Sequence, residues 1–151
     1  LKNYGCAAYI VSESGSKLLA SKSRLAPLRQ KLTIPKLELM SMLIMSRFSK
    51  DIVMTYKLEL KFQAIHWWMD SSCCLDWILS NKTHPNIFIN NRLIEIRKNL
   101  DPIKPHLHYV PSGQNPADII TKPNNYNLDN NKRRKEKSWC ANSSLWRIGG
   151  Y

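Results

Sequence analysis

One stretch constrains the fold more than any other: FQAIHWWM (62–69), which ends directly at Asp70. Its short length and its aromatic and apolar content predict a buried strand, and SSCCLDWILS (71–80) behind it has the apolar spacing of a helix. A carboxylate at the end of a buried segment is costly unless a helix cap, a salt bridge or a metal ion compensates it. The stretch therefore predicts a sheet covered by helices, with an acidic residue where a strand gives way to a helix.

Short apolar runs and helical spacings alternate along most of the remaining chain. YGCAAYIV (4–11) and KLLASKSRL (17–25) flank the polar turn SESGSK and predict a β-hairpin. Successive strand residues face opposite sides, so one of Trp67 and Trp68 is expected to pack under the helices. Further predicted elements are helices over 35–56 and 86–100, a strand over 106–110 and a short helix over 115–121. Strands that alternate with helices indicate an α/β or α+β sheet domain.

Length and charge limit the class of protein. The 151 residues suit one domain, and a hydrophobic content of 43% is enough for a core. Lys and Arg number 23 against 11 Asp and Glu, which gives a net charge of +12. This excess indicates nucleic acid as the first candidate partner and an anionic membrane surface as the second, or else a basic protein with neither. No apolar run approaches the ~18 residues of a membrane span.

The cysteines and the two ends of the chain carry further expectations. No cysteine has zinc-ligand spacing, so all are expected to be reduced, in an intracellular protein. The first residues resemble neither a signal peptide nor a transit peptide, and the chain begins as if inside a longer polypeptide. After residue 122 the sequence becomes polar, Asn-rich and basic. We therefore expect a domain over 1–122 and a surface segment with a C-terminal tail over 123–151.

Three acidic residues stand apart from the others. Glu38 is expected in the first turn of the long helix, Asp70 ends the buried strand, and Asp118 follows Asn-Pro-Ala after a turn. Singly, Glu38 and Asp118 suit a helix dipole, and Asp70 suits a helix cap. Together at one sheet edge they indicate Mg²⁺ or Mn²⁺, because three carboxylates repel unless cations bridge them. Two such ions about 3.5–4 Å apart can activate water against a phosphodiester.

Several motifs occur in one order: LTIPKLEL, WMDSSCCLDWI, NNRLIEI, HYVPSGQNPADIITK and SSLW. Together they resemble the ribonuclease H domain of Pao/BEL-type LTR retrotransposon polyproteins, over nearly the whole chain. The resemblance implies a mixed sheet flanked by helices. It also implies a site of four acids and two divalent metal ions that cuts the RNA strand of RNA–DNA hybrids. Matched motif by motif, Glu38, Asp70 and Asp118 are three of these catalytic, metal-binding acids.

The sequence departs from this pattern at its start. The family's first acid lies on the first, central strand, in a D-A-S-like motif just before Y-G. Here only three residues precede Tyr4 and Gly5. The first central strand and its acid are therefore expected to be missing from this chain, which leaves unpaired backbone inside the sheet. We expect this chain alone to bind metal poorly and to cut slowly or not at all.

The resemblance implies an RNA–DNA hybrid as partner, together with the reverse transcriptase and integrase regions of the same polyprotein. It places the protein in the cytoplasm or in the element's particle, with no membrane. The loop PSGQNP lacks the His that some retroviral relatives carry before the last Asp, and His106 and His108 are expected to be structural or exposed. Asp70-Ser71-Ser72 lacks the Gly of an aspartic protease motif, so peptidase activity is rejected.

Other residues are candidates for contacts with the hybrid. Three cations flank the expected site and either bind phosphates or are ordinary solvated cations: Lys22, Arg24 and Lys36. Ser71 and Asn115 either touch the hybrid backbone or cap helices. The basic run 132–135 either adds salt-dependent affinity or belongs to a solvated linker.

Three hypotheses about function follow. The first is a ribonuclease H-type nuclease domain, present as an incomplete fragment. The second is a module that binds nucleic acid or partner domains without catalysis. The third is a structural connection domain that supports the reverse transcriptase.

Overall fold

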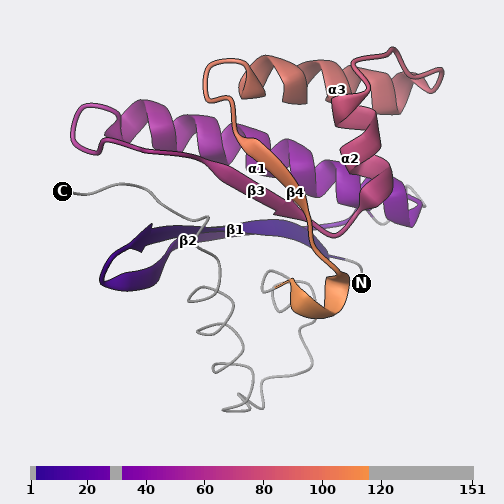
Figure 1. Cartoon of the computed structure of the whole chain (residues 1–151). Coiled ribbons are helices and arrows are strands. Elements are labelled where there is room, and N and C mark those ends of the chain that lie inside the picture. The colour runs from indigo at the N-terminus through magenta and orange to yellow at the C-terminus, as the bar shows by residue number, and fades with distance from the viewer. Residues whose placement is uncertain (1–2, 28–31, 116–151) are drawn as a thin grey trace.

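A computed structural model describes residues 3–27 and 32–115 of the chain. These residues form four strands and three α-helices in the order ββαβααβ, followed by a 3₁₀ helix at Ser112–Gln114 (Figure 1). The mixture of helices and strands confirms the predicted fold class. The predicted boundary at residue 122 and the segment 123–151 lie outside the described residues, as does the predicted helix 115–121 beyond its first residue.

The N-terminal hairpin consists of β1 (Asn3–Ser12) and β2 (Gly15–Leu25), which pair antiparallel as predicted. Gly15 follows the turn with φ 118°, a backbone conformation that favours glycine. On the face of β1 that meets the first helix, Tyr4 and Cys6 are buried. The hairpin therefore contributes a small core of its own.

Helix α1 (Ile34–Tyr56) is the central element of the fold. Pro35 lies in its first turn, as predicted, where a missing N–H leaves no bond unmade. One side, with Leu37 and Ile44, packs on the hairpin, while Leu39 and Leu43 on another side enter the larger core. The helix is therefore buried on two sides.

Strand β3 (His66–Met69) pairs parallel with β4 (His106–Tyr109), and α2 (Ser72–Leu79) and α3 (Ile87–Leu100) connect them. The predicted strand over 62–69 is thus too long by its first four residues. Its partner explains this: His106 and Val110 donate to Ile65 and Met69, and the next donor back along the chain, Lys104, bonds instead to the oxygen of Leu100 at 2.7 Å.

The β3–β4 pair has one face toward the helices and one face away from them. Trp67 is only 2% exposed and packs in the larger core with Met69. Trp68 lies on the opposite face and stacks on His108, with ring centroids 4.3 Å apart. The expectation that one of the two tryptophans packs under the helices is therefore confirmed.

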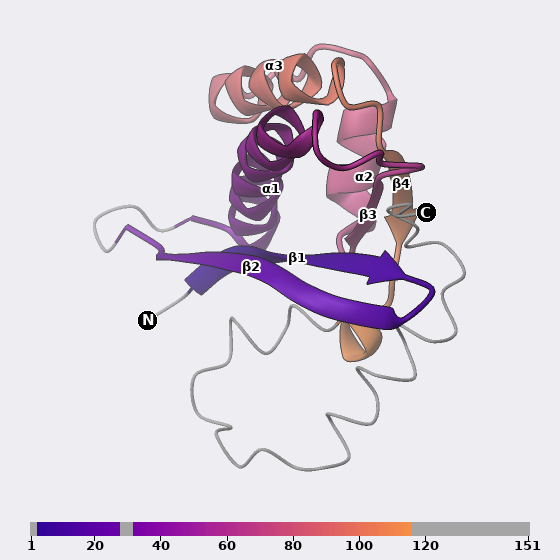
Figure 2. The ribbon, with the colours of Figure 1, turned by 90° about the vertical axis from the view of Figure 1, so that its left-hand side faces the viewer.

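The hairpin and the β3–β4 pair are two separate sheets in the described parts of the chain. Figure 2 shows the hairpin crossing beneath α1, with β3 and β4 standing beside the helix and α3 on its far side. The single mixed sheet that the resemblance implies is therefore divided between β1 and β3. This is the position that the family gives to its first, central strand. None of the described helices is both long and apolar enough to cross a membrane.

Candidate metal and nucleic-acid site

Glu38 lies near the beginning of α1 and is partly buried. Since the helix begins at Ile34, Glu38 is its fifth residue and lies beyond the first turn, contrary to the prediction. The favourable field of a helix N-terminus fades within the first turn, so the helix dipole explains this acid less well than the sequence suggests. The flanking Leu37 and Leu39 are buried, which fixes the direction in which the helix presents Glu38.

Asp70 follows β3 directly and precedes α2 by one residue. The cap of α2 is Ser71, whose Oγ accepts a hydrogen bond from the backbone N–H of Cys74 at 3.2 Å. The alternative in which Asp70 caps this helix is therefore wrong, because Ser71 already satisfies the free N–H. Ser71 is the capping residue, and Asp70 retains its carboxylate for another partner.

The beginnings of α1 and α2 meet at Cys74. Its Sγ lies 3.6 Å from the backbone oxygen of Pro35, which joins the first turns of the two helices. The pKa of the Cys74 thiol is raised to about 12, first by burial and then by negative charges that include Glu38 and Asp70, against the lowering effect of its hydrogen bond with Ser71. Both carboxylates therefore act on the same thiol, so the fold brings Glu38 and Asp70 to one neighbourhood.

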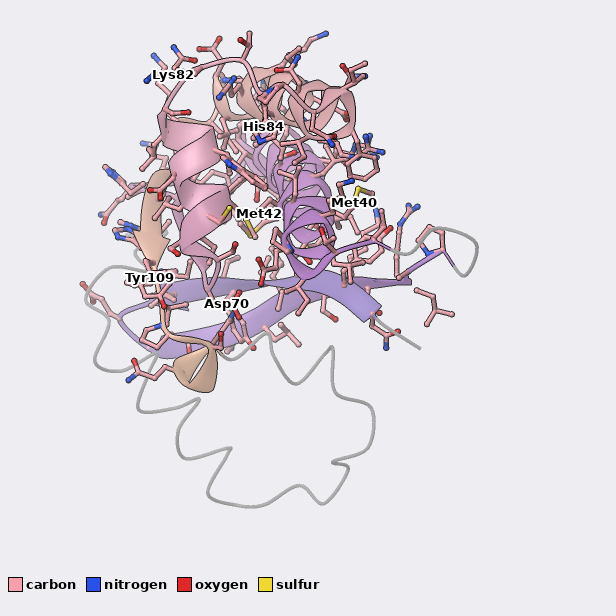
Figure 3. The ribbon with its side chains drawn as sticks, turned by 90° about the vertical axis from the view of Figure 1, so that its right-hand side faces the viewer. Met40, Met42, Asp70, Lys82, His84 and Tyr109 are labelled. Atoms are coloured by element: carbon pink, nitrogen blue, oxygen red, sulfur yellow. The ribbon has the colours of Figure 1, made fainter. Side chains whose placement is uncertain are left out.

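The two ends of α2 lie at different distances from the hairpin. Figure 3 shows Asp70 and Tyr109 at the end of α2 that lies nearer the hairpin, and Lys82 and His84 at its far end. Met69 and Tyr109 are partners in the β3–β4 register, so the two parallel strands end side by side at Asp70. This is the edge at which sites collect in sheets of parallel strands.

The acids present account for part of a metal site. Among residues 3–27 and 32–115, no group of three or more His, Cys, Asp or Glu side chains is arranged to hold a metal ion. Glu38 and Asp70 offer oxygen ligands of the kind that Mg²⁺ and Mn²⁺ prefer. Asp118, the third predicted ligand, lies outside the described residues.

The predicted cations are found on two elements. Lys22 and Arg24 are exposed on β2, opposite Cys6 and Tyr4 of β1. Lys36 lies on α1, two residues before Glu38, and is partly buried. The remaining candidate, Asn115, follows the 3₁₀ helix, where its backbone N–H donates to the oxygen of Ser112 at 3.2 Å.

A histidine cluster was not predicted as a unit. His66 Nδ1 and His108 Nε2 lie 2.9 Å apart, and the ring of His66 also stacks on His106 at 4.9 Å. Burial, followed by the charge of neighbouring histidines, lowers the pKa of His66 and of His108. The signal in the sequence is the alternation His-x-Trp and His-x-His on two paired strands, which becomes readable only once the pairing is known.

Sequence reasoning also missed Arg92, on α3. Its guanidinium lies over the ring of Phe88, with Cζ 3.3 Å from the ring centroid. Lys36 lies over the same ring, with Nζ 5.2 Å from the centroid. Nothing in the local pattern of α3 separates Arg92 from other surface cations, because the contact with α1 is what distinguishes it.

An antiparallel hairpin, a long central helix and a parallel βααβ unit form a mixed α/β domain, an arrangement consistent with a ribonuclease H-like fold. Residues 1–71 match the family model described as Pao retrotransposon-like RNaseH-like domain. The match agrees with the predicted resemblance over this part of the chain and supports a Pao RNase H-like domain there. It includes Glu38 and Asp70 and ends before Asn115 and Asp118. No curated protein and no solved structure matches the chain.

Proposed function

We propose that this domain serves metal-dependent hydrolysis of the RNA strand in RNA–DNA hybrids during reverse transcription. The observation that supports the proposal is the convergence of Glu38 and Asp70 at the joined beginnings of α1 and α2, where both charges act on Cys74. Asp118 is the third acid of the proposal. Bound Mg²⁺ or Mn²⁺ supplies an activated water and offsets charge on the phosphodiester.

The chain's own residues have defined parts in this proposal. Glu38 and Asp70 provide carboxylate oxygens for the metal ions, and Ser71 holds the first turn of α2 so that Asp70 is positioned beside it. Lys22, Arg24 and Lys36 provide positive charge for the phosphate backbone, with Ser71 and Asn115 as polar contacts. The reverse transcriptase and integrase regions of the polyprotein are the proposed neighbours of the domain.

A non-catalytic module that binds nucleic acid is the second candidate. It is supported by the exposed cations Lys22 and Arg24 on β2, which can attract a phosphate backbone without any metal ion. The net charge of +12 supports both candidates equally, because cleavage and simple binding both require attraction to the phosphate backbone.

Cleavage of a labelled RNA–DNA hybrid in Mg²⁺ separates the two candidates. We expect little or no cleavage by the 151-residue chain, and faster cleavage by a chain carrying about ten natural upstream residues, the length of one long strand. Equal rates from the two chains would contradict the proposed dependence on a further strand and acid.

Asp70→Asn tests the acid itself, because it removes the charge while keeping the size of the side chain. We expect the active chain to lose at least about 100-fold in rate when a ligand of the catalytic ions is lost. Asp76→Asn is the matched control, because Asp76 is exposed on α2 and the substitution removes the same charge. Salt-dependent hybrid binding without cleavage, in every chain tested, would favour the second candidate.

A further inference from the structure

Two cations share one aromatic ring where α1 and α3 begin side by side. The guanidinium of Arg92 lies 3.3 Å from the centroid of Phe88, and the ammonium of Lys36 lies 5.2 Å from it. A ring face attracts a cation, which offsets part of the cost of holding two positive charges together. The ring therefore gathers charge from two helices at one point on the surface.

Arg92 is held in a fixed orientation by its other contacts. Its Nη1 donates to the backbone oxygen of Phe88 at 2.9 Å, and its Nε lies 3.1 Å from Sδ of Met40. Figure 3 shows Met40 and Met42 on different sides of α1: Met42 is buried in the larger core, and Met40, partly buried, packs against the edge of that core. Within the described residues, Nη2 of Arg92 makes no hydrogen bond and remains available to a ligand.

No acidic side chain among the described residues pairs with these cations. The nearby carboxylate of Glu95 is already engaged by Arg47, through bonds of 2.6 and 2.9 Å to its two oxygens. Burial lowers the pKa of Arg92, and the positive charge of Arg47 lowers it further, against the opposing charges of Glu95 and Tyr4. Among the residues that the structure describes, the positive charge of Arg92 is therefore partly desolvated and has no acidic side chain bonded to it.

We propose that Arg92, Phe88 and Lys36 form a binding site for a backbone phosphate of the nucleic acid. The occupant rests on the proposed function, whereas the site rests on the contacts above. A guanidinium held in place loses little entropy on binding and meets a phosphate with directed N–H groups, and Lys36 adds a point charge. Lys36 lies two residues before Glu38 on α1, so the site flanks the acidic edge and guides the strand toward it.

Binding of a labelled RNA–DNA hybrid, measured by fluorescence anisotropy in EDTA, tests the site without any cleavage. We expect Arg92→Gln to weaken binding about fivefold to tenfold at low salt and to reduce the salt slope by about one. Lys98→Gln is the matched control, because Lys98 is exposed in the last turn of the same helix. Equal affinities for the two variants would overturn the proposal.

A second variant separates charge from position. Phe88→Leu keeps both cations but removes the ring that holds them, and it should weaken binding in the same direction as Arg92→Gln. Thermal unfolding shows whether each variant is folded. A folded Phe88→Leu chain that binds as tightly as the unaltered chain would contradict the role of the ring.

A double-mutant cycle of Arg92→Gln and Lys36→Gln tests whether both cations bind the same phosphate. If they do, the double variant loses less affinity than the two single losses combined, because the first loss already releases the phosphate. Independent losses would contradict a shared site. Inorganic phosphate tests the other source of the same chemistry: stabilisation that Arg92→Gln abolishes, with hybrid binding unchanged, would assign the site to free phosphate.

Failure of this inference and failure of the proposed function give different results. An unaltered chain that does not bind the hybrid contradicts both. A chain that binds equally well with Gln at position 92 contradicts only the phosphate site. A chain that binds through Arg92 but never cleaves supports the site and favours the non-catalytic candidate.

Discussion

Cys73 and Cys74 are neighbours in the chain but have opposite environments. Cys74 is fully buried, and burial raises its pKa to about 12, while Cys6 is buried with its pKa raised to about 11. Cys73 is exposed, with a pKa raised by desolvation and then by the charges of Glu38 and Asp76. Because the thiolate is the reactive form, Cys73 should be the first of these three to be alkylated by iodoacetamide at about pH 8.

Peptide mapping by mass spectrometry measures this order. Cys6 and Cys74 should react only after denaturant unfolds the chain, and Asp76→Asn should accelerate the reaction of Cys73 by removing one of the charges that raise its pKa. Labelling of Cys74 as fast as Cys73 in the folded chain would contradict the burial that the packing of α2 on α1 requires.

A buried polar pair joins α1 to α3. Ser46 Oγ donates to the backbone oxygen of Leu43 at 2.8 Å and accepts from Asn99 Nδ2 at 3.1 Å. Ser46→Ala leaves the Asn99 amide without this partner, and the free energy of unfolding should fall by about 1–3 kcal/mol. Denaturant unfolding measures the change. Ser41→Ala is the control: Ser41 makes only a 3.4 Å bond to its own helix, so a change within about 0.5 kcal/mol is expected.

At the scale of the elements, the hairpin depends on a close approach at Gly5. A Cβ at this position would lie 2.4 Å from the backbone oxygen of Lys22 and 2.9 Å from Cα of Ser23. Because both atoms are backbone, β1 and β2 must move apart to accommodate it. Gly5→Ala should therefore lower the free energy of unfolding by about 1–3 kcal/mol. Gly113→Ala meets open space and should unfold like the unaltered chain, and equal effects of the two would contradict the pairing.

The elements show which features a sequence predicts. The starts of α2 and α3 are local signals, since Ser71 and Asn86 each accept a bond from a backbone N–H three residues on. The length of β3 is not local, because its partner strand begins only after Lys104, whose N–H bonds to the end of α3. The phosphate site is also not local, since Arg92 is distinguished only by what α1 places beside it.

At the scale of the whole molecule, the sequence predicts more of the fold than of the site. The apolar spacing of each segment is sufficient to predict the hairpin, the helices and the two later strands in their order along the chain. The convergence of Glu38 and Asp70 depends on how α1 and α2 pack, and the motif resemblance, rather than the spacing, identifies both residues. Nothing in the described residues tests the role of Asp118, which stays a prediction.

The histidines on β3 and β4 make the stability of the whole domain depend on pH. His66 and His108 share one hydrogen bond, which requires that one of the two nitrogens carry no proton. Their pKa values are lowered in the folded chain, by burial first and then by neighbouring histidines, so the unfolded chain binds protons more readily. Their contribution to stability is therefore fully present above the ordinary pKa of about 6.5 and is lost as the pH falls through the lowered folded values.

Thermal unfolding between about pH 7.5 and about pH 5, a span that brackets the ordinary histidine pKa, tests this linkage. The melting temperature should fall toward the acidic end, and His108→Gln should flatten the fall because the glutamine side chain does not titrate. His84→Gln is the control, since His84 packs against Trp77 away from the cluster and its loss should leave the pH dependence in place. A fall as steep in His108→Gln as in the unaltered chain would place the titrating groups elsewhere. A flattened fall would show that the β3–β4 pair, from which the domain presents Asp70, loosens when its histidines become charged.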